Sequence, residues 1–520
     1  MEAAPFLFET NFSTLDWGIV VTYILSMGAV GMLVNKYIHS VSDYMVGGRA
    51  TGLALNTASY IGTELGLVTV MYASIEAFTR GFAYLSIPLI GLMAAFIIGK
   101  TGWVIQELRK QRLVTIPEYF EKRYNWKIRV LSGVLMASSG ILNMGLFPKM
   151  GATFLAYSTG LVALGDAQTI VNMVMTLLIL LVVAYTIMGG MVAVIVTDYF
   201  QFVVLSIGLL IGLYFAFSDP VISWDRIVDT MTFAKGEAAV NPFAPDSYGV
   251  VYLVWMLIVY ITSNFSWGPV ASRALTAENP EVARQTFLLG APGQFIRTAV
   301  PALFALAAFA WFVQDPGWRQ FFFPNGVAQG AAHVAEAMPL FMGKLLPVGL
   351  LGILVAGLLA AFMSTHDSYF LTWASVISRD IISPFKKQGI SQQEQIRYAR
   401  ISIALMGLFL LVWGLWYELP DSVWTYMAIT GNVYLTGAAA ALVGGIYWKK
   451  ASTAGAWAAM LGGLISIVGL FPLQELIPWL SIGVLGLANY VLCALLLVVF
   501  SLLYPDRKPE IKPEEAASNE

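Results

Sequence analysis

Cysteine and histidine are nearly absent from this chain of 520 residues. The single cysteine, Cys493, excludes an internal disulfide and any metal cluster held by several cysteines. The three histidines, His39, His333 and His366, are too few for a histidine-rich metal or catalytic centre. No nucleophile motif and no cluster of metal-ligating residues indicates an enzyme.

Charged residues are also scarce. They make up 12% of the chain, about half of the roughly 25% that is typical of soluble proteins. Hydrophobic residues make up 58%, and the mean hydropathy is +0.74. No soluble fold of this size buries so much apolar surface, so the composition predicts an all-α polytopic membrane protein and excludes soluble enzymes and nucleic-acid binders. The formal net charge of −2 indicates no partner of either sign.

Long apolar runs recur along the whole chain. A bilayer core of about 30 Å takes roughly 20 helical residues to cross. Thirteen runs meet this length, and they centre on 17–37, 52–79, 82–106, 128–158, 168–189, 191–217, 249–272, 285–313, 345–378, 398–417, 423–447, 454–472 and 483–504. The fifth and sixth runs meet at Gly189-Gly190, which predicts a tight turn between two helices. An odd number of spans places the termini on opposite sides of the membrane.

The distribution of lysine and arginine predicts the orientation, because cytoplasmic loops carry the excess of these residues. With the N-terminus outside, 23 of the 29 Lys and Arg residues fall in segments assigned to the cytoplasm, among them Arg273, Arg284 and Arg297. Five fall in outer loops, and Lys149 lies inside a span. We therefore predict a multi-pass protein of the plasma (inner) membrane with its N-terminus outside and its C-terminus in the cytoplasm.

A few ionisable side chains lie inside the predicted spans, where each costs at least about 2.5–3.5 kcal/mol on insertion scales. They are Glu64, Lys149, Asp198, His366 and Asp367, with Glu76 nearer a helix end. A single such residue can pair with another or sit in water near an interface. Several of them on two or three helices favour a path for a solute or an ion.

The ninth span carries a stripe of small polar residues. At 3.6 residues per turn, Ala361, Ser364, Thr365 and Ser368 share one face of the helix, with Asp367 at its edge. Hydroxyls and a free carbonyl suit an alkali cation stripped of water. The alternative is that the hydroxyls join neighbouring helices by hydrogen bonds. His366 falls about 200° around the helix from Ser364, so we interpret it as structural.

Two spans are interrupted by glycine or proline beside polar residues. The second holds Gly62-Thr63-Glu64-Leu65-Gly66, and the seventh holds Asn264-Phe265-Ser266-Trp267-Gly268-Pro269. Two broken helices, five spans apart, are typical of inverted-repeat transporters, which bind substrate and ions where these helices unwind. This pattern makes Thr63, Glu64, Asn264, Ser266 and Trp267 candidates for substrate binding and coupling. Lys149, beside Pro148, is a further candidate that could instead pair with Glu64 or extend to the interface.

The spacing divides the chain into segments. We expect an outer N-terminus, first helix and cytoplasmic link at 1–51, a first five-helix repeat at 52–217 and an extracellular loop at 218–248. A second repeat follows at 249–447, then two peripheral helices at 448–504 and a disordered cytoplasmic tail at 505–520.

Four motifs together resemble the sodium:solute symporter family. They are Asp43-Tyr44-x2-Gly47-Gly48-Arg49, then Thr115-Ile116-Pro117-Glu118-Tyr119-Phe120-Glu121-Lys122-Arg123, a run with Tyr185, Gly189, Gly190, Thr197, Asp198 and Gln201, and Ala360-Ala361-x2-Ser364-Thr365. Each motif alone is weak, but the set occurs in order over most of the chain. The resemblance implies thirteen helices around a leucine-transporter-type inverted repeat.

The resemblance also implies ligands for sodium. The family's main site is similar to the carbonyls of Gly62, Leu65 and Ala361 with the hydroxyls of Ser364 and Thr365. A second site resembles Asp198, Asp367 and Ser368, although Asp367 stands where some relatives have serine. Glu64 occupies the place of an essential aspartate of proline carriers. The glutamine pattern of sugar carriers is absent from the second span, which disfavours a sugar.

We therefore predict a sodium-coupled symporter that imports a small organic solute by alternating access. Its partners are the solute, sodium ions and membrane lipid; it needs no organic cofactor, binds no nucleic acid and works as a monomer. A proton-coupled carrier is the closest alternative, with Glu64 or Asp367 titrating and Lys149 as the counter-charge. A membrane-embedded enzyme is the weakest of the alternative functions. The sequence identifies neither the solute nor the number of sodium ions.

Overall fold

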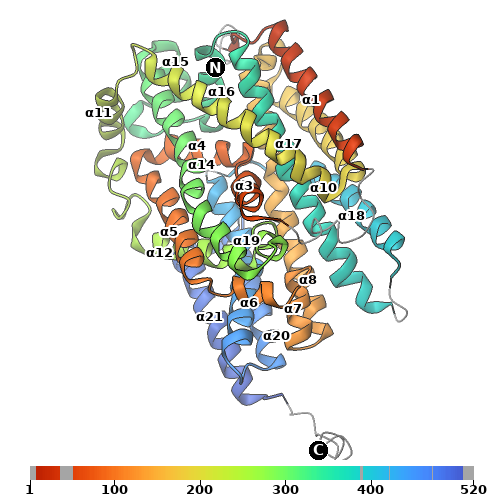
Figure 1. The fold of residues 1–520 in the computed structure, drawn as a ribbon. Helices are drawn as coiled ribbons and strands as arrows, with labels where there is room; N and C mark the ends of the chain where they lie inside the picture. The colour runs from red at the N-terminus through yellow and green to blue at the C-terminus, as the bar shows by residue number, and fades with distance from the viewer. Residues whose placement is uncertain (1–7, 36–50, 387–389, 421, 471, 507–520) are drawn as a thin grey trace, which may run out of the picture.

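The computed structural model describes residues 8–35, 51–386, 390–420, 422–470 and 472–506, and every element in these ranges is helical (Figure 1). The α-helices are α1 (Thr14–Asn35), α3 (Leu53–Glu64), α4 (Leu67–Arg80), α5 (Ser86–Thr101), α6 (Ile105–Lys110), α7 (Ile116–Arg123), α8 (Trp126–Asn143), α9 (Phe147–Ser158), α10 (Ala167–Ser218), α11 (Trp224–Lys235), α12 (Gly249–Ser266), α13 (Gly268–Thr276), α14 (Pro280–Gln314), α15 (Pro316–Phe322), α16 (Val334–Leu345), α17 (Leu350–Val376), α18 (Gln392–Trp416), α19 (Val423–Tyr447), α20 (Thr453–Gly462) and α21 (Ile482–Leu503). A π-helical turn at Ile377–Ile382 extends α17.

Nine helical segments in the described ranges are long and apolar enough to cross a membrane. Three shorter apolar helices, Thr14–Ser26, Val203–Ser218 and Thr453–Gly469, accompany them. The helical, multi-span architecture is therefore confirmed, whereas the number thirteen stays a prediction. The same holds for the segment boundaries. The motif at 43–49 and the tail beyond 506 lie outside the described residues.

Both predicted interruptions are present. α3 ends at Glu64 and α4 begins at Leu67, with Leu65 and Gly66 outside helical geometry. α12 and α13 are separated by Trp267, whose backbone is extended at φ −73° and ψ 119°. Pro269 follows in the first turn of α13, where its missing N–H costs no hydrogen bond. These two breaks are the discontinuous helices that the sequence predicts.

Other helix ends follow local rules. Asn125 begins α8 by accepting hydrogen bonds from the backbone of Lys127 and Ile128. Ser391 and Glu394 form a capping box at the start of α18. Pro148 lies in the first turn of α9, just after a short 3₁₀ turn, so the fourth predicted span is interrupted before the proline.

The predicted turn at Gly189-Gly190 is wrong, because α10 is helical without interruption from Ala167 to Ser218. A straight helix of 52 residues would be about 78 Å long, far more than a bilayer core. Both of its halves pack against other helices of the bundle. Val183 lies against Gly407 of α18, and Leu205 and Gly208 lie against Gly357 and Leu354 of α17. Two glycines did not suffice to end the helix.

Nearly all residues of α17 are buried, so α17 is a central helix of the bundle. It packs against α10 on one side and against α1, α8 and α18 elsewhere. α14 is the second central helix, and it packs along α3, α4 and α5. Three halves of the broken helices, α3, α4 and α13, contact both of these long helices.

The bundle has two ends, one marked by Arg80 and the other by Thr51. At the Arg80 end, α4 ends and α12, α17 and α19 begin, and the side chain of Arg80 donates to the Ser247 carbonyl at 3.2 Å. At the Thr51 end, α3 begins and α13 ends. There Thr51 forms an isolated parallel bridge with Ala277.

Candidate functional site

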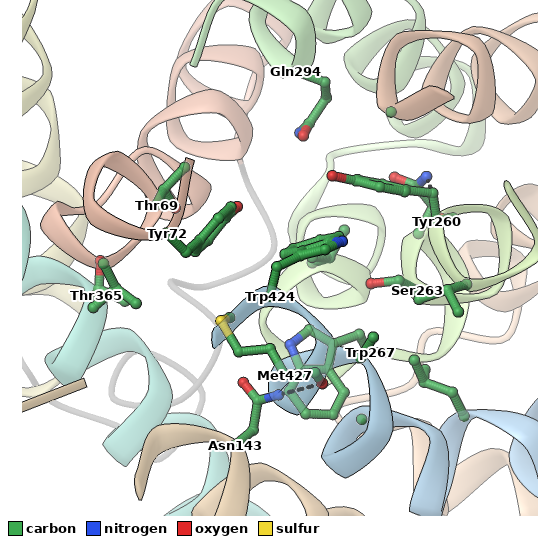
Figure 2. A pocket seen from close by; sticks show the side chains of 18 of the residues that line it. Thr69, Tyr72, Asn143, Tyr260, Ser263, Trp267, Gln294, Thr365, Trp424 and Met427 are labelled. Atoms are coloured by element: carbon green, nitrogen blue, oxygen red, sulfur yellow. Dashed lines mark hydrogen bonds between the residues drawn. The ribbon is translucent and has the colours of Figure 1, made fainter. Parts of the chain in front are cut away.

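A cavity of about 100 Å³ lies beside both helix breaks (Figure 2). Its volume is below the roughly 300–1,000 Å³ of sites for drug-sized ligands, so it suits a small solute. Its walls come from α4, α12, α14, α17 and α19 with parts of α5, α8, α9 and α13. Its polar and aromatic lining residues are Thr69, Tyr72, Asn143, Phe147, Tyr260, Ser263, Asn264, Trp267, Gln294, Arg297, Thr365, Tyr369 and Trp424.

Three aromatic side chains of the lining, Tyr72, Tyr260 and Trp424, form an aromatic layer (Figure 2). The Trp424 ring lies 4.9 Å from the Tyr72 ring and 5.5 Å from the Tyr260 ring, measured between centroids. These three side chains come from α19, α4 and α12. The layer therefore joins one half of each broken helix, α4 and α12, to α19.

A hydrogen-bonded layer lies one turn beyond the aromatic one. The buried Glu76 carboxylate accepts hydrogen bonds from the Tyr248 hydroxyl at 3.0 Å, from Arg80 at 3.2 Å and from the Ser422 hydroxyl. Arg80 also lies over the Tyr248 ring, 4.4 Å from its centroid. Glu76 therefore joins α4 to the segments that begin α12 and α19.

The break between α3 and α4 lies directly against α17. A side chain added at Gly66 would collide with the Thr365 hydroxyl and lie 3.5 Å from the Ala361 carbonyl oxygen. Thr365 donates a hydrogen bond to that carbonyl at 2.9 Å. Only glycine leaves room for this approach. The structure thus brings the break, Ala361 and Thr365 together, as the sodium-site prediction requires.

The same place has the polarity that a cation needs. Leu65 follows the C-terminal end of α3, where backbone carbonyls carry partial negative charge. The Ile61 and Gly62 carbonyls accept the Leu65 N–H at 3.1 and 3.2 Å, and each carbonyl oxygen has a second lone pair. Ser364 is buried on the adjoining face of α17. These donor groups are hard oxygens, and they fit an alkali cation.

Asp367 lies wholly buried on α17 and faces the first half of α10. Its carboxylate accepts a hydrogen bond from the Thr186 hydroxyl. The neighbouring Ser368 is also buried, and its carbonyl accepts from Thr372 at 2.7 Å. Helix α10 passes through Asp198, but the side chain of Asp198 lies outside the described part of the structure.

Two other ionisable residues lie away from the cavity lining. His366 bonds to the Phe362 carbonyl at 2.8 Å and packs among the rings of Phe147, Phe362 and Phe370. This agrees with the structural interpretation of His366. Lys149 donates to the Tyr417 carbonyl at 3.2 Å, at the C-terminal end of α18. That contact favours neither the Glu64 pairing nor solute contact for Lys149.

The candidate solute residues divide into three groups. Asn264 and Trp267 line the cavity: the Asn264 side chain accepts from the Tyr60 hydroxyl at 2.8 Å, and the Trp267 indole donates to the Tyr369 hydroxyl at 3.2 Å. Ser266 is buried but does not line the cavity. The side chains of Thr63 and Glu64 lie outside the described residues.

Sequence reasoning missed a charged residue of the lining. Arg297 was assigned to a cytoplasmic segment, but it lies near the middle of α14, is 5% exposed and faces the cavity. That assignment is therefore wrong, and the number of Lys and Arg residues assigned to cytoplasmic segments falls by one. The signal was present in the sequence, because Arg297 falls in the centre of the predicted span 285–313. Gln294, one turn away, lines the cavity too.

Comparison with known proteins decides the family. The sequence pattern of the sodium:solute symporter family matches residues 44–463, which is most of the chain. The chain belongs to the sodium:solute symporter family. It is a multi-pass membrane transporter that couples sodium to the movement of a small solute, and its family members are transporters rather than enzymes.

The symporter is similar along its whole length to curated relatives. It is 25% identical to the sodium/sialic acid symporter SiaT of Proteus mirabilis (strain HI4320), over 98% of this chain and 99% of the relative. It is 24% identical to the sodium/proline symporter of Haemophilus influenzae (strain ATCC 51907 / DSM 11121 / KW20 / Rd), over 94% of each chain.

A solved structure shares the fold. It is a Na+-coupled sialic acid symporter in a substrate-bound, outward-open state, which superposes with a TM-score of 0.76 at 20% identity and covers 96% of the symporter and 100% of that chain. The family assignment and the leucine-transporter-type fold predicted from the motifs are thereby confirmed.

Proposed function

We propose that the symporter imports a small organic solute together with sodium by alternating access, and that the cavity beside the two helix breaks holds the solute. The contact between Gly66 and Thr365 carries this proposal. Thr365 touches the broken helix and also lines the cavity. Because Thr365 lies at both the helix break and the cavity, an ion bound at the break holds in place a side chain that the solute contacts.

The proposed sodium ligands are five oxygens: the carbonyls of Gly62, Leu65 and Ala361 and the hydroxyls of Ser364 and Thr365. The burial of Leu65, Ala361, Ser364 and Thr365 and the close approach of Gly66 to α17 support the assignment. The break that follows the partial negative end of α3 lies against the Thr365 hydroxyl and the Ala361 carbonyl. A dehydrated sodium ion satisfies these oxygens together.

A second sodium site is proposed at Asp198, Asp367 and Ser368. The burial of Asp367 supports it, because a bound cation offsets the cost of a carboxylate in the membrane. The same burial favours the rival function, in which Asp367 binds and releases a proton instead. The sodium-coupled and the proton-coupled function differ in the ion whose gradient drives uptake of the solute.

We further propose that the Arg80 end faces the outside of the plasma membrane and that the symporter works as a monomer, with its N-terminus outside. The proposed orientation follows the remaining excess of Lys and Arg in the segments assigned to the cytoplasm. In this orientation Glu76 and the aromatic layer close the solute cavity to the exterior.

Uptake into proteoliposomes tests the coupling ion. Purified symporter is reconstituted, and the sodium gradient and the pH gradient are imposed separately with a set of radiolabelled solutes. We expect accumulation to follow the sodium gradient and to ignore the pH gradient. Accumulation driven by the pH gradient without sodium would favour the proton mechanism at Asp367.

The ligand assignment is tested with a matched pair of variants. Thr365→Ala should raise the sodium concentration for half-maximal uptake about tenfold or more, because a ligand is lost. Thr372→Ala is the control: it lies on the same helix and donates the same kind of bond to the carbonyl four residues earlier, but it lies outside the cavity lining. Equal sodium dependence of the two variants would exclude Thr365 as a ligand.

A further inference from the structure

The fourth predicted span is interrupted where it reaches the cavity. α8 ends at Asn143, and the 3₁₀ turn Met144–Leu146 separates it from α9. Asn143 is 3% exposed and lines the cavity. A side-chain amide at this depth needs partners for both its nitrogen and its oxygen, because lipid supplies none.

The nitrogen of the Asn143 amide is fully engaged by α19. It donates to the Met427 carbonyl at 2.8 Å and to the Thr430 hydroxyl at 3.0 Å. These contacts fix which way the amide is turned: a carbonyl only accepts, and the Thr430 hydroxyl gives its own hydrogen to the Tyr426 carbonyl at 2.8 Å. In Figure 2 the amide nitrogen lies at a dashed hydrogen bond, and the amide oxygen is turned away from it.

The oxygen of the Asn143 amide is buried, and no described residue donates a hydrogen bond to it. The buried indole N–H of Trp424, in the same lining, has no acceptor in the described ranges either. By contrast, the Asn264 amide accepts from the Tyr60 hydroxyl and donates to the Tyr260 carbonyl, each at 2.8 Å. Because a buried polar atom without a partner is unfavourable, Asn143 and Trp424 favour a molecule that brings one donor and one acceptor.

We propose that Asn143 selects the solute: its amide oxygen accepts a hydrogen bond from an O–H or N–H of the solute, and the Trp424 indole donates to a solute oxygen. This rests on the proposed function, in which the cavity holds the solute. The solute is then a hydroxylated or amino compound with an oxygen acceptor, such as a sugar, a sugar acid or an amino acid. Because α19 already holds the amide in place, binding costs little ordering of this side chain.

Solute analogues test this selection. Proteoliposomes with an inward sodium gradient receive radiolabelled D-glucose, N-acetylneuraminate, L-proline or glycine betaine; betaine alone among them has neither O–H nor N–H. We expect at least one of the first three to accumulate and betaine to stay out. Analogues of that solute then lose one donor at a time, by fluorine in place of a hydroxyl or by dimethylation of the proline nitrogen. At least one analogue should need about a tenfold or higher concentration for half-maximal uptake, since it leaves the amide oxygen unpaired.

Variants connect this discrimination to the two residues. Asn143→Leu should raise the half-saturating solute concentration about tenfold or more, and the loss of the solute donor should then cost less than in the wild type, because both changes remove one bond. Trp424→Phe, which keeps a ring but loses the N–H, should raise it too. Ser139→Ala is the control: Ser139 also joins α8 to α19, by donating to the Thr430 carbonyl at 2.6 Å, but it lies outside the cavity lining. Its solute kinetics should match those of the wild type.

The alternative is an ordered water on the Asn143 oxygen, which would satisfy the amide without contacting the solute. In that case every analogue would be taken up like its parent, and Asn143→Leu would keep wild-type solute kinetics. Either result, accumulation of betaine alone, or accumulation of none of the four solutes would overturn the proposal. The analogue comparison uses the wild type, so it holds even if Asn143→Leu fails to insert.

Sodium binding separates this proposal from the proposed function. Binding of radioactive sodium to purified Asn143→Leu should match the wild type, because the proposed sodium ligands are untouched. Wild-type protein that binds no sodium would refute the proposed function instead.

Discussion

Replacing Gly66 by alanine inserts one methyl group into the proposed sodium site. The new Cβ would lie 3.3 Å from the Thr365 Cβ and 3.5 Å from the Ala361 carbonyl oxygen, and it would overlap the Thr365 hydroxyl. Gly66 has φ −108° and ψ 168°, a conformation that alanine adopts without strain. The effect of the substitution is therefore confined to the steric contact.

The contact can be relieved in two ways, and each displaces proposed ligands. The Thr365 hydroxyl can rotate away from the Ala361 carbonyl, to which it donates at 2.9 Å, or α4 can move away from α17. Overpacking of this kind costs about 1–3 kcal/mol. If the cost falls on the ion-bound state, the sodium concentration for half-maximal uptake rises by roughly 5- to 150-fold.

The assay is sodium-dependent uptake into proteoliposomes of a solute that the wild type accumulates. Gly52→Ala is the control, because nothing lies within 4 Å of a side chain added at Gly52, and its sodium dependence should stay unchanged. In a Thr365→Ala background the added methyl no longer meets a hydroxyl. The two substitutions should then be less than additive.

One result would refute this reasoning. If Gly66→Ala inserts, unfolds at the wild-type temperature and keeps the wild-type sodium dependence, then the break does not contact the sodium site. A loss of insertion alone would be recognised by comparison with Gly52→Ala.

Three further substitutions test other parts of the account. Glu76→Gln removes the charge that holds α4 to the segments before α12 and α19, where each charged hydrogen bond contributes about 1.5–3 kcal/mol. An impermeant maleimide should therefore label Ser263→Cys about tenfold faster in the Glu76→Gln variant. An unchanged labelling rate would contradict closure of the cavity by Glu76. Asp367→Asn should convert a sigmoidal sodium dependence of uptake into a hyperbola, and an unchanged Hill coefficient would exclude a second sodium there. Lys149→Met should leave the half-saturating solute concentration unchanged, because Lys149 contacts the Tyr417 carbonyl; a tenfold rise would restore Lys149 as a solute ligand.

The sequence predicts the features of this site that depend on local chemistry. Glycine and proline beside polar groups located both helix breaks, since these residues weaken a helix wherever they stand. The spacing of Ala361, Ser364 and Thr365 on one helical face needed only the period of 3.6 residues. Motif resemblance then supplied the family and the proposed carbonyl ligands.

Features that depend on packing could not be predicted. Gly189-Gly190 reads as a turn, yet the backbone of α10 stays helical there, because helix propensity is a weak prior that tertiary context overrides. Glu76 and Ser422 are 346 residues apart, and no local pattern indicates their contact. Arg297 differs from these cases: its charge is typical of a loop, but its position within the span 285–313 already indicates the membrane.

Binding of radioactive sodium to the purified protein tests the central claim most directly, because it requires no knowledge of the solute. We expect saturable binding that unlabelled sodium displaces and potassium does not. Binding should be lost in the Ser364→Ala/Thr365→Ala double variant and kept in Thr372→Ala. A double variant that binds sodium with wild-type affinity would contradict the placement of the coupling ion at the break between α3 and α4.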